Sequence, residues 1–256
     1  MATPIGLARA DSSVALDLVL AVDVSGSVST ERFELQKQGY VAAFRDPRVI
    51  SAIKTAAGGS IAVTMTQWTG PHMQVQVVPW MSVRDEATAN QLASAVEAAP
   101  RRLFSGGTSI SGAIDHAVRL LSDSPSRGVR RVIDLSGDGA NNHGRPAAEA
   151  RDEAIAANIV INGLPILALD PHLETYYRNN VIGGPGAFVI AARSYDTFAE
   201  AIVRKLVLEI AGRSHPRGSD RHADMTVGNP DVGLATPLES HSIAVRNVCL
   251  VSRTQP

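Results

Sequence analysis

Oxygen-bearing side chains occur at three places in the sequence, each beside a glycine. Asp23, Ser25 and Ser27 alternate along one short segment, with a glycine between the two serines that lets the backbone fold tightly. Thr108 follows a pair of glycines, and Asp138 stands between two more. Carboxylate and hydroxyl oxygens are hard ligands that suit Mg²⁺, or Mn²⁺ where it is available, and disfavour Zn²⁺. If the fold brings these five side chains together, they predict a divalent-cation site.

The elements that must position these side chains alternate between strand and helix. Val14 to Asp23 is rich in β-branched residues and leucine, as expected of a strand that is buried on both faces. The predicted strands cover residues 14–23, 60–68, 73–80, 129–135, 159–169 and 187–191, and the predicted helices cover 29–44, 86–98, 110–121, 146–157 and 196–210. This alternation predicts an α/β fold with a doubly wound, mostly parallel sheet and helices on both faces.

One predicted strand is expected to run antiparallel at the edge of the sheet. The strands at 60–68 and 73–80 are separated only by Thr-Gly-Pro-His, which is typical of a hairpin turn.

In a doubly wound sheet, ligands bind at the carboxyl ends of the strands, where the strand order reverses. Asp23 and Asp138 both lie at the ends of predicted strands, so we expect the cation site at the carboxyl ends of these two strands.

Composition excludes several classes of protein. The chain has 256 residues, with 24 Lys and Arg against 25 Asp and Glu, and this near-neutral balance argues against a nucleic-acid partner. Cys249 is the only cysteine, which rules out an intrachain disulfide and a cysteine-based metal cluster. No uninterrupted apolar run approaches the roughly 18 residues that a membrane span requires.

Composition also predicts where the domain ends. Residues 213–256 contain no Phe, Tyr or Trp and four prolines, so we expect a C-terminal tail of low order. The predicted organisation is an N-terminal extension at 1–13, one domain at 14–212 and this tail at 213–256.

Asp23, Ser25, Ser27, Thr108 and Asp138, in this order, resemble the metal-ion-dependent adhesion site of von Willebrand factor type A domains. The chain is most similar to a bacterial group of such proteins of unknown function. The similar segments are residues 20–27, 104–112, 136–139, 161–166, 181–186 and 204–210. The resemblance covers about residues 14–212 and does not extend to the tail.

The resemblance implies a role for each of the five residues. Ser25, Ser27 and Thr108 would bind the cation directly, and Asp23 and Asp138 would bind it directly or through water. It also implies that an Asp or Glu of a partner protein completes the coordination. Neutral hydroxyl ligands leave the charge of the cation poorly neutralised, which would attract such a carboxylate.

The resemblance also bears on location and on movement. Proteins of this bacterial group usually carry an export signal, which favours a periplasmic or secreted location. Ala8-Arg9-Ala10 is similar to the end of such a signal, but no basic and apolar segment precedes it, so the compartment stays open. In many relatives the last helix moves when the metal coordination changes, which makes the helix at 196–210 the candidate mobile element.

The sequence therefore predicts a cation-dependent protein-binding module that is not an enzyme. Haloacid dehalogenase phosphatases require an aspartate where this chain has Ser25, and no phosphate-binding loop, dinucleotide-binding glycine motif or nucleophile elbow occurs. Two alternatives are a Mg²⁺-dependent hydrolase, in which the same cation activates water, and a structural cation site without a partner. The partner and the oligomeric state stay open.

Two further sets of residues are given a structural interpretation. Asn141, Asn142 and His143 are interpreted as turn residues, although they follow Asp138 closely. The arginine pairs at 101–102 and 130–131 are expected to face solvent.

Overall fold

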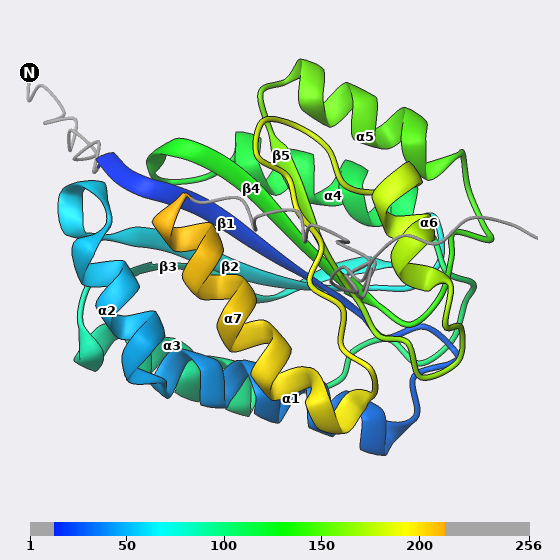
Figure 1. Cartoon of the computed structure of the whole chain (residues 1–256), viewed down its shortest axis with the longest axis horizontal. Coiled ribbons are helices and arrows are strands. Elements are labelled where there is room, and N and C mark those ends of the chain that lie inside the picture. Colours follow the sequence, from blue (N-terminus) through cyan, green and yellow to red (C-terminus); the bar gives the residue numbers. More distant parts are fainter. Residues whose placement is uncertain (1–12, 213–256) are drawn as a thin grey trace, which may run out of the picture. The chain divides into compact units, whose positions relative to one another are not determined.

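The computed structural model describes residues 13–212, which form one five-stranded sheet between two layers of helices (Figure 1). The strands are β1 (Ser13–Asp23), β2 (Ile61–Trp68), β3 (Gln74–Val83), β4 (Arg127–Gly137) and β5 (Val160–Pro165). Their order is β3-β2-β1-β4-β5. All neighbours are parallel except β3, which runs antiparallel to β2 at one edge. The predicted fold class is confirmed.

The helices divide into two groups, one on each face of the sheet (Figure 1). The helices on one face are α1 (Thr30–Arg45), α2 (Pro47–Thr55), α3 (Glu86–Ala98) and α7 (Phe198–Ala211). Those on the other face are α4 (Ile110–Ser122), α5 (Ala147–Ala156) and α6 (Leu173–Asn180). Two short 3₁₀ helices, η1 (Ala57–Gly59) and η2 (Tyr195–Thr197), complete the described elements.

The central strand β1 is buried along almost its whole length. Successive side chains of a strand point to opposite faces, so Leu18 and Leu20 pack under α1 and α7, whereas Val19 packs under α4 and α5. A strand that is covered on both faces needs apolar residues at nearly every position, which explains the continuous apolar run in the sequence.

Two helices were not predicted from the sequence. One is α2, which begins at Pro47, three residues after the helix predicted at residues 29–44. Asp46 caps that helix, because its side chain accepts a hydrogen bond from the backbone N–H of Arg48 at 2.8 Å. Proline suits a first helical position, where its missing N–H has no partner to lose. Helix α6 was missed as well.

The predicted strand at 187–191 is wrong, and β5 ends at Pro165 instead of residue 169. The segment after α6 pairs with β5 only through isolated bridges, one of them between Gly163 and Val189. Gly163 exchanges backbone hydrogen bonds with Phe188 and Ile190. The next bond of a regular parallel ladder would come from the N–H of residue 165, which proline lacks. The proline therefore interrupts the ladder.

Close packing holds α7 against α1 (Figure 1). A Cβ atom on Gly39 of α1 would lie only 2.6 Å from Cδ1 of Phe198, so glycine is needed for this approach. The ring of Tyr40 meets that of Phe198 edge-on, with 5.3 Å between the centroids. The first residue of α7 therefore packs directly against α1.

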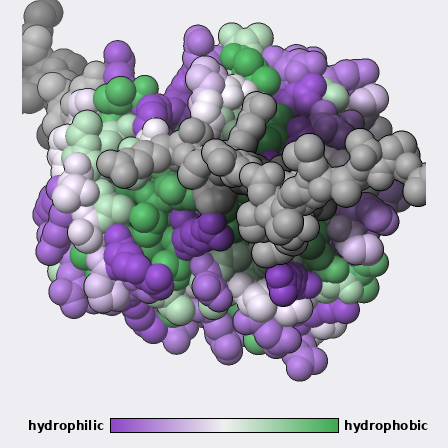
Figure 2. All heavy atoms as spheres, in the orientation of Figure 1, coloured by the Kyte–Doolittle hydropathy of each residue, from purple (hydrophilic) through white to green (hydrophobic). Residues whose placement is uncertain are grey.

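Figure 2 shows one side of the molecule, where hydrophilic residues cover much of the visible surface and hydrophobic residues form smaller groups between them. Within residues 13–212, no helix combines the length and the apolar character needed to cross a membrane. The predictions for the N-terminal extension and for the tail beyond Gly212 concern residues outside the described range.

Candidate metal site

Asp23 and Asp138 lie side by side at the carboxyl ends of two neighbouring strands. Asp23 is the last residue of β1, and Asp138 directly follows β4. Strand β1 pairs with β2 on one side and with β4 on the other, so the strand order reverses between β1 and β4. This is the position at which doubly wound sheets bind ligands.

A chain of hydrogen bonds joins four of the five predicted site residues. The backbone N–H of Ser25 donates to Oδ1 of Asp23 at 2.7 Å. The hydroxyls of Ser25 and Ser27 are 3.1 Å apart, and the hydroxyl of Ser27 donates to Oδ1 of Asp138 at 2.5 Å. The oxygen side chains of two distant segments therefore converge at one place.

Thr108, the fifth predicted residue, lies beside this chain. Its backbone N–H donates to Oδ1 of Asn142 at 2.8 Å, and its carbonyl accepts from the backbone N–H of Asn142 at 2.9 Å. A Cβ atom on Gly139 would lie 3.7 Å from the Thr108 hydroxyl oxygen. The hydroxyl thus reaches the backbone that immediately follows Asp138.

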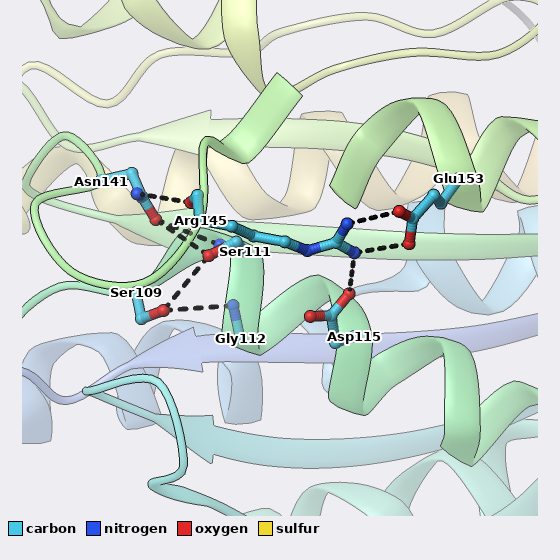
Figure 3. Close-up of polar contacts among 7 residues, drawn as sticks. All are labelled: Ser109, Ser111, Gly112, Asp115, Asn141, Arg145 and Glu153. Atoms are coloured by element: carbon cyan, nitrogen blue, oxygen red, sulfur yellow. Dashed lines mark hydrogen bonds and ion pairs between the residues drawn. The ribbon is translucent and has the colours of Figure 1, made fainter. Parts of the chain in front are cut away.

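Polar contacts hold the loop after Asp138 against the start of α4 (Figure 3). Asn141 accepts from the backbone N–H of Ser111 at 3.1 Å and donates to the carbonyl of Arg145 at 3.1 Å. The guanidinium of Arg145 pairs with Asp115 of α4 at 2.6 Å and with Glu153 of α5 at 2.5 Å. The residues interpreted as turn residues therefore join the two loops that carry Thr108 and Asp138.

Two residues that the sequence did not indicate contact Asp138. The hydroxyl of Tyr195 in η2 donates to Oδ2 of Asp138 at 2.8 Å. Nη1 of Arg32 lies 3.7 Å from the same oxygen and donates to the carbonyl of Ser27 at 2.8 Å. The Arg32 guanidinium also lies 5.3 Å from the centroid of the Tyr195 ring. No spacing pattern links these residues to Asp138, so sequence reasoning had no signal for them.

Arg102 is exposed, but the expectation that the arginine pairs face solvent is wrong for Arg101, Arg130 and Arg131, which are partly buried. The guanidinium of Arg131 donates to the carbonyl of Ala157. Nη2 of Arg101 donates to the carbonyl of Val24, inside the turn that carries the serines, at 3.0 Å. Nη2 of Arg130 donates to the carbonyl of Glu209 near the end of α7 at 2.8 Å. These guanidinium groups satisfy backbone carbonyls, which helix ends and irregular turns leave without partners.

Asp23 shows that the site is suited to a cation. Its side chain is completely buried, and its Oδ2 has no hydrogen-bond partner among the described residues. Burial, together with the nearby carboxylate of Asp138, raises the pKa of Asp23 to about 7. A buried carboxylate oxygen without a partner is unfavourable, and a hard dication among these oxygens would offset that penalty. The residues present therefore fit a divalent cation.

The space beneath Asp23 depends on Gly137. A Cβ atom at that position would lie 2.9 Å from Oδ2 of Asp23 and 2.9 Å from the hydroxyl of Tyr177. The Tyr177 hydroxyl is also buried without a hydrogen-bond partner in the described part of the chain. Glycine is thus required here because any side chain would crowd the Asp23 carboxylate.

Comparison with known proteins places the chain in a family. Residues 13–214 match the family described as "Protein of unknown function (DUF1194)". No curated protein shows significant similarity to the chain.

Three solved structures illustrate the likeness in fold. Proximal thread matrix protein 1 from the mussel byssus, with a zinc-occupied MIDAS motif, is 14% identical over 78% of this chain and 49% of its own, with a TM-score of 0.56. The pilus adhesin SpaC from Lactobacillus rhamnosus GG is 17% identical over 77% of this chain and 31% of its own, with a TM-score of 0.55. A von Willebrand factor type A protein from Catenulispora acidiphila is 18% identical over 78% of this chain and 43% of its own, with a TM-score of 0.50.

The chain spans less than half of each of these three structures, and identities of this size show a common fold. The family match, by contrast, covers nearly all of the described residues. The chain therefore belongs to the DUF1194 family of proteins of unknown function, and it has the fold of a von Willebrand factor type A domain.

Proposed function

We propose that this protein binds another protein through a divalent cation held by Asp23, Ser25, Ser27, Thr108 and Asp138. The observation that carries the proposal is the buried Oδ2 of Asp23, which has no hydrogen-bond partner among the described residues. Through its other carboxylate oxygen, Oδ1, Asp23 belongs to a hydrogen-bonded cluster that also contains Asp138 and the hydroxyls of Ser25 and Ser27. Two buried carboxylates so close together repel each other, and a bound cation would offset that repulsion.

Mg²⁺ is the proposed cation, with Mn²⁺ as a substitute. All five side chains offer oxygen, and neither histidine nor cysteine is among them. The mussel protein of similar fold is described with zinc at its MIDAS motif, which supports a divalent cation at this position in general. The preference for Mg²⁺ rests on the donor atoms of this chain.

An acidic side chain of a protein is the proposed ligand. Three of the five binding side chains are neutral hydroxyls, so the bound cation would keep a strong attraction for an anion. A pilus adhesin is among the proteins of similar fold, and this supports a protein partner. Mg²⁺ commonly keeps several water ligands, one of which the carboxylate would replace.

We assign binding, and no catalytic step, to this site. The alternative of a Mg²⁺-dependent hydrolase is tested by screening phosphoesters and carboxylic esters with the cation present. Steady turnover that disappears in Asp23→Ala would establish the hydrolase and contradict this assignment.

The proposal is tested by capture on the immobilised protein, in Mg²⁺ and in chelator. We expect a partner that is retained in Mg²⁺, released by chelator and not retained by Asp138→Ala. Asp152→Ala is the matched control, because Asp152 is an exposed carboxylate paired with Arg151 on α5. Calorimetric Mg²⁺ binding without any chelator-sensitive partner would instead indicate a structural cation site.

A further inference from the structure

Three exposed large apolar side chains lie in loops at the end of the sheet that carries the candidate metal site. Among the described residues, only Met73, Phe104, Val129 and Leu169 expose a large apolar side chain. Met73 lies in the turn after β2, Phe104 lies in the loop before α4, and Leu169 follows β5, whereas Val129 lies near the start of β4 at the opposite end. Single exposed apolar residues are common. Met73, however, lies beside the loop that follows Phe104, since a Cβ on Gly106 would be 3.1 Å from its Sδ, and neighbouring exposed apolar side chains beside a candidate site indicate an interaction surface.

Phe104 is connected to the site through Arg101. Phe104 is 66% exposed, and its ring centroid lies 5.3 Å from the Arg101 guanidinium carbon. The same guanidinium donates to the carbonyl of Val24, directly before Ser25. The aromatic ring is therefore attached, through one arginine, to the turn that carries two of the proposed metal ligands.

The backbone also fixes the position of Phe104 relative to Thr108. Gly106 has φ of +114°, a conformation that side chains rarely adopt, and its carbonyl lies 3.8 Å from where a Cβ of Gly26 would be. A Cβ on Gly107 would overlap the ring of His143. These two glycines hold the loop close to the serine turn on one side and to the loop after Asp138 on the other.

Positive charge beside the candidate metal site favours an anionic partner. Arg32 and Arg101 both donate to backbone carbonyls of the serine turn, so two guanidinium groups stand next to the proposed cation. Together they favour an anionic segment, and Phe104 with Met73 adds an apolar area that an acidic side chain alone would not cover.

We infer that Phe104 forms an apolar subsite beside the cation, and that the partner is an exposed protein segment with an acidic residue flanked closely by an apolar one. The acid completes the metal coordination, and the apolar side chain packs on Phe104. This inference rests on the proposed function, because it specifies the partner of the same site.

The experiment uses the full chain and immobilised synthetic heptapeptides with one central glutamate. Flanking positions are leucine in one set and serine in a second, and a third set has leucine flanks around a central glutamine. We expect chelator-sensitive binding of both glutamate sets, with about tenfold tighter binding of the leucine-flanked set, as burial of one apolar contact would give. The glutamine set should not bind.

Phe104→Ser should lower binding of the leucine-flanked set to that of the serine-flanked set, without weakening the latter. Val129→Ser is the matched control, because Val129 is 74% exposed at the far end of the sheet, and it should change nothing. A leucine preference that survives in Phe104→Ser, or equal binding of both glutamate sets by the unaltered chain, would overturn the inference.

Failure of the underlying function gives a different pattern. If Mg²⁺ binds by calorimetry but no glutamate peptide is retained, capture of an acid is wrong and the subsite is wrong with it. Sedimentation that shows Mg²⁺-dependent self-association, abolished by Phe104→Ser, would identify a second copy of the chain as the occupant and likewise overturn the inference.

Discussion

At the scale of single residues, Asp23 determines how the site responds to pH. Its carboxylate is buried next to Asp138, and both effects raise its pKa to about 7 in the cation-free protein. A proton and a cation therefore compete for the same group near neutral pH.

We predict that Mg²⁺ affinity rises with pH up to about 7 and then levels off, because Asp23 must lose its proton to bind the cation. Well below pH 7 the affinity should change by roughly tenfold per pH unit if one proton is displaced. Calorimetry at several pH values measures both the affinity and the proton release. A constant affinity from about pH 5.5 to 8 would show that Asp23 is already ionised without the cation.

Tyr195 is the residue whose hydroxyl orients Asp138. It donates to Oδ2, while Ser27 donates to Oδ1, so both carboxylate oxygens are held. Groups that orient a metal ligand typically contribute 10- to 100-fold to metal affinity.

We predict that Tyr195→Phe lowers Mg²⁺ affinity about tenfold. The free energy of unfolding without cation should fall by about 1.5–3 kcal/mol, as for one hydrogen bond to a charged group. Tyr176→Phe is the control, since that hydroxyl accepts from the backbone of Asn141 and does not bond to a carboxylate. Equal Mg²⁺ affinities of Tyr195→Phe and the unaltered protein would exclude the orienting role.

At the scale of elements, α7 is held to the sheet by a buried charge cluster. Nζ of Lys205 lies 2.7 Å from Asp134 of β4 and 2.5 Å from Glu209. Asn162 of β5 donates to Glu209 at 3.0 Å. Lys205 and both carboxylates are fully buried, and the pKa of Glu209 is raised to about 8, first by burial and then by Asp134.

The raised pKa predicts how stability depends on pH. An acid whose pKa is higher in the folded state contributes stability that is complete below its unfolded pKa and is lost as pH rises through the folded value. For Glu209 this window runs from the ordinary 4.5 to about 8. The tyrosine hydroxyl of Tyr40 and the guanidinium of Arg130 also face this cluster.

We predict that the free energy of unfolding falls between about pH 5 and 8, and that Glu209→Gln flattens this fall and is the more stable protein at pH 8. Denaturant unfolding in excess Mg²⁺ is the measurement, because the bound cation keeps Asp23 from contributing to the slope. Glu149→Gln, on α5, is the control for loss of one carboxylate. The same slope in Glu209→Gln and the unaltered protein would contradict the prediction.

At the scale of the whole molecule, the cation site joins segments that are far apart in the sequence. Asp23 follows β1, Thr108 precedes α4, Asp138 follows β4, and Tyr195 precedes α7. A ligand that needs all these segments in place binds only the folded state, so it must stabilise the folded protein.

We predict that Mg²⁺ raises Tm in a saturable manner, and that the gain in unfolding free energy reaches about 2.7 kcal/mol at a Mg²⁺ concentration of 100 times Kd. Asp138→Ala should stay folded and lose this increment, because the cation loses a carboxylate. Calorimetric or fluorescence melting with and without chelator measures the increment. An unchanged Mg²⁺ response in Asp138→Ala would place the cation elsewhere.

The spacing of residues and the alternation of strands and helices were enough to predict part of the site from the sequence. Asp23, Ser25 and Ser27 occupy one turn because of their alternating spacing, and strand–helix alternation brings the ends of β1 and β4 to one edge. Pro47 and Pro165 show where such rules fail, since a proline can begin a helix as well as end one, and can interrupt a ladder.

Only the tertiary structure decided which other side chains surround these oxygens. Tyr195 reaches Asp138, and Lys205 reaches Asp134, only because α7 crosses the sheet in one particular packing with α1. Such contacts join residues more than 50 positions apart, and no periodicity in the sequence encodes them. They depend on how whole elements pack, which is set by the shapes of many buried side chains at once.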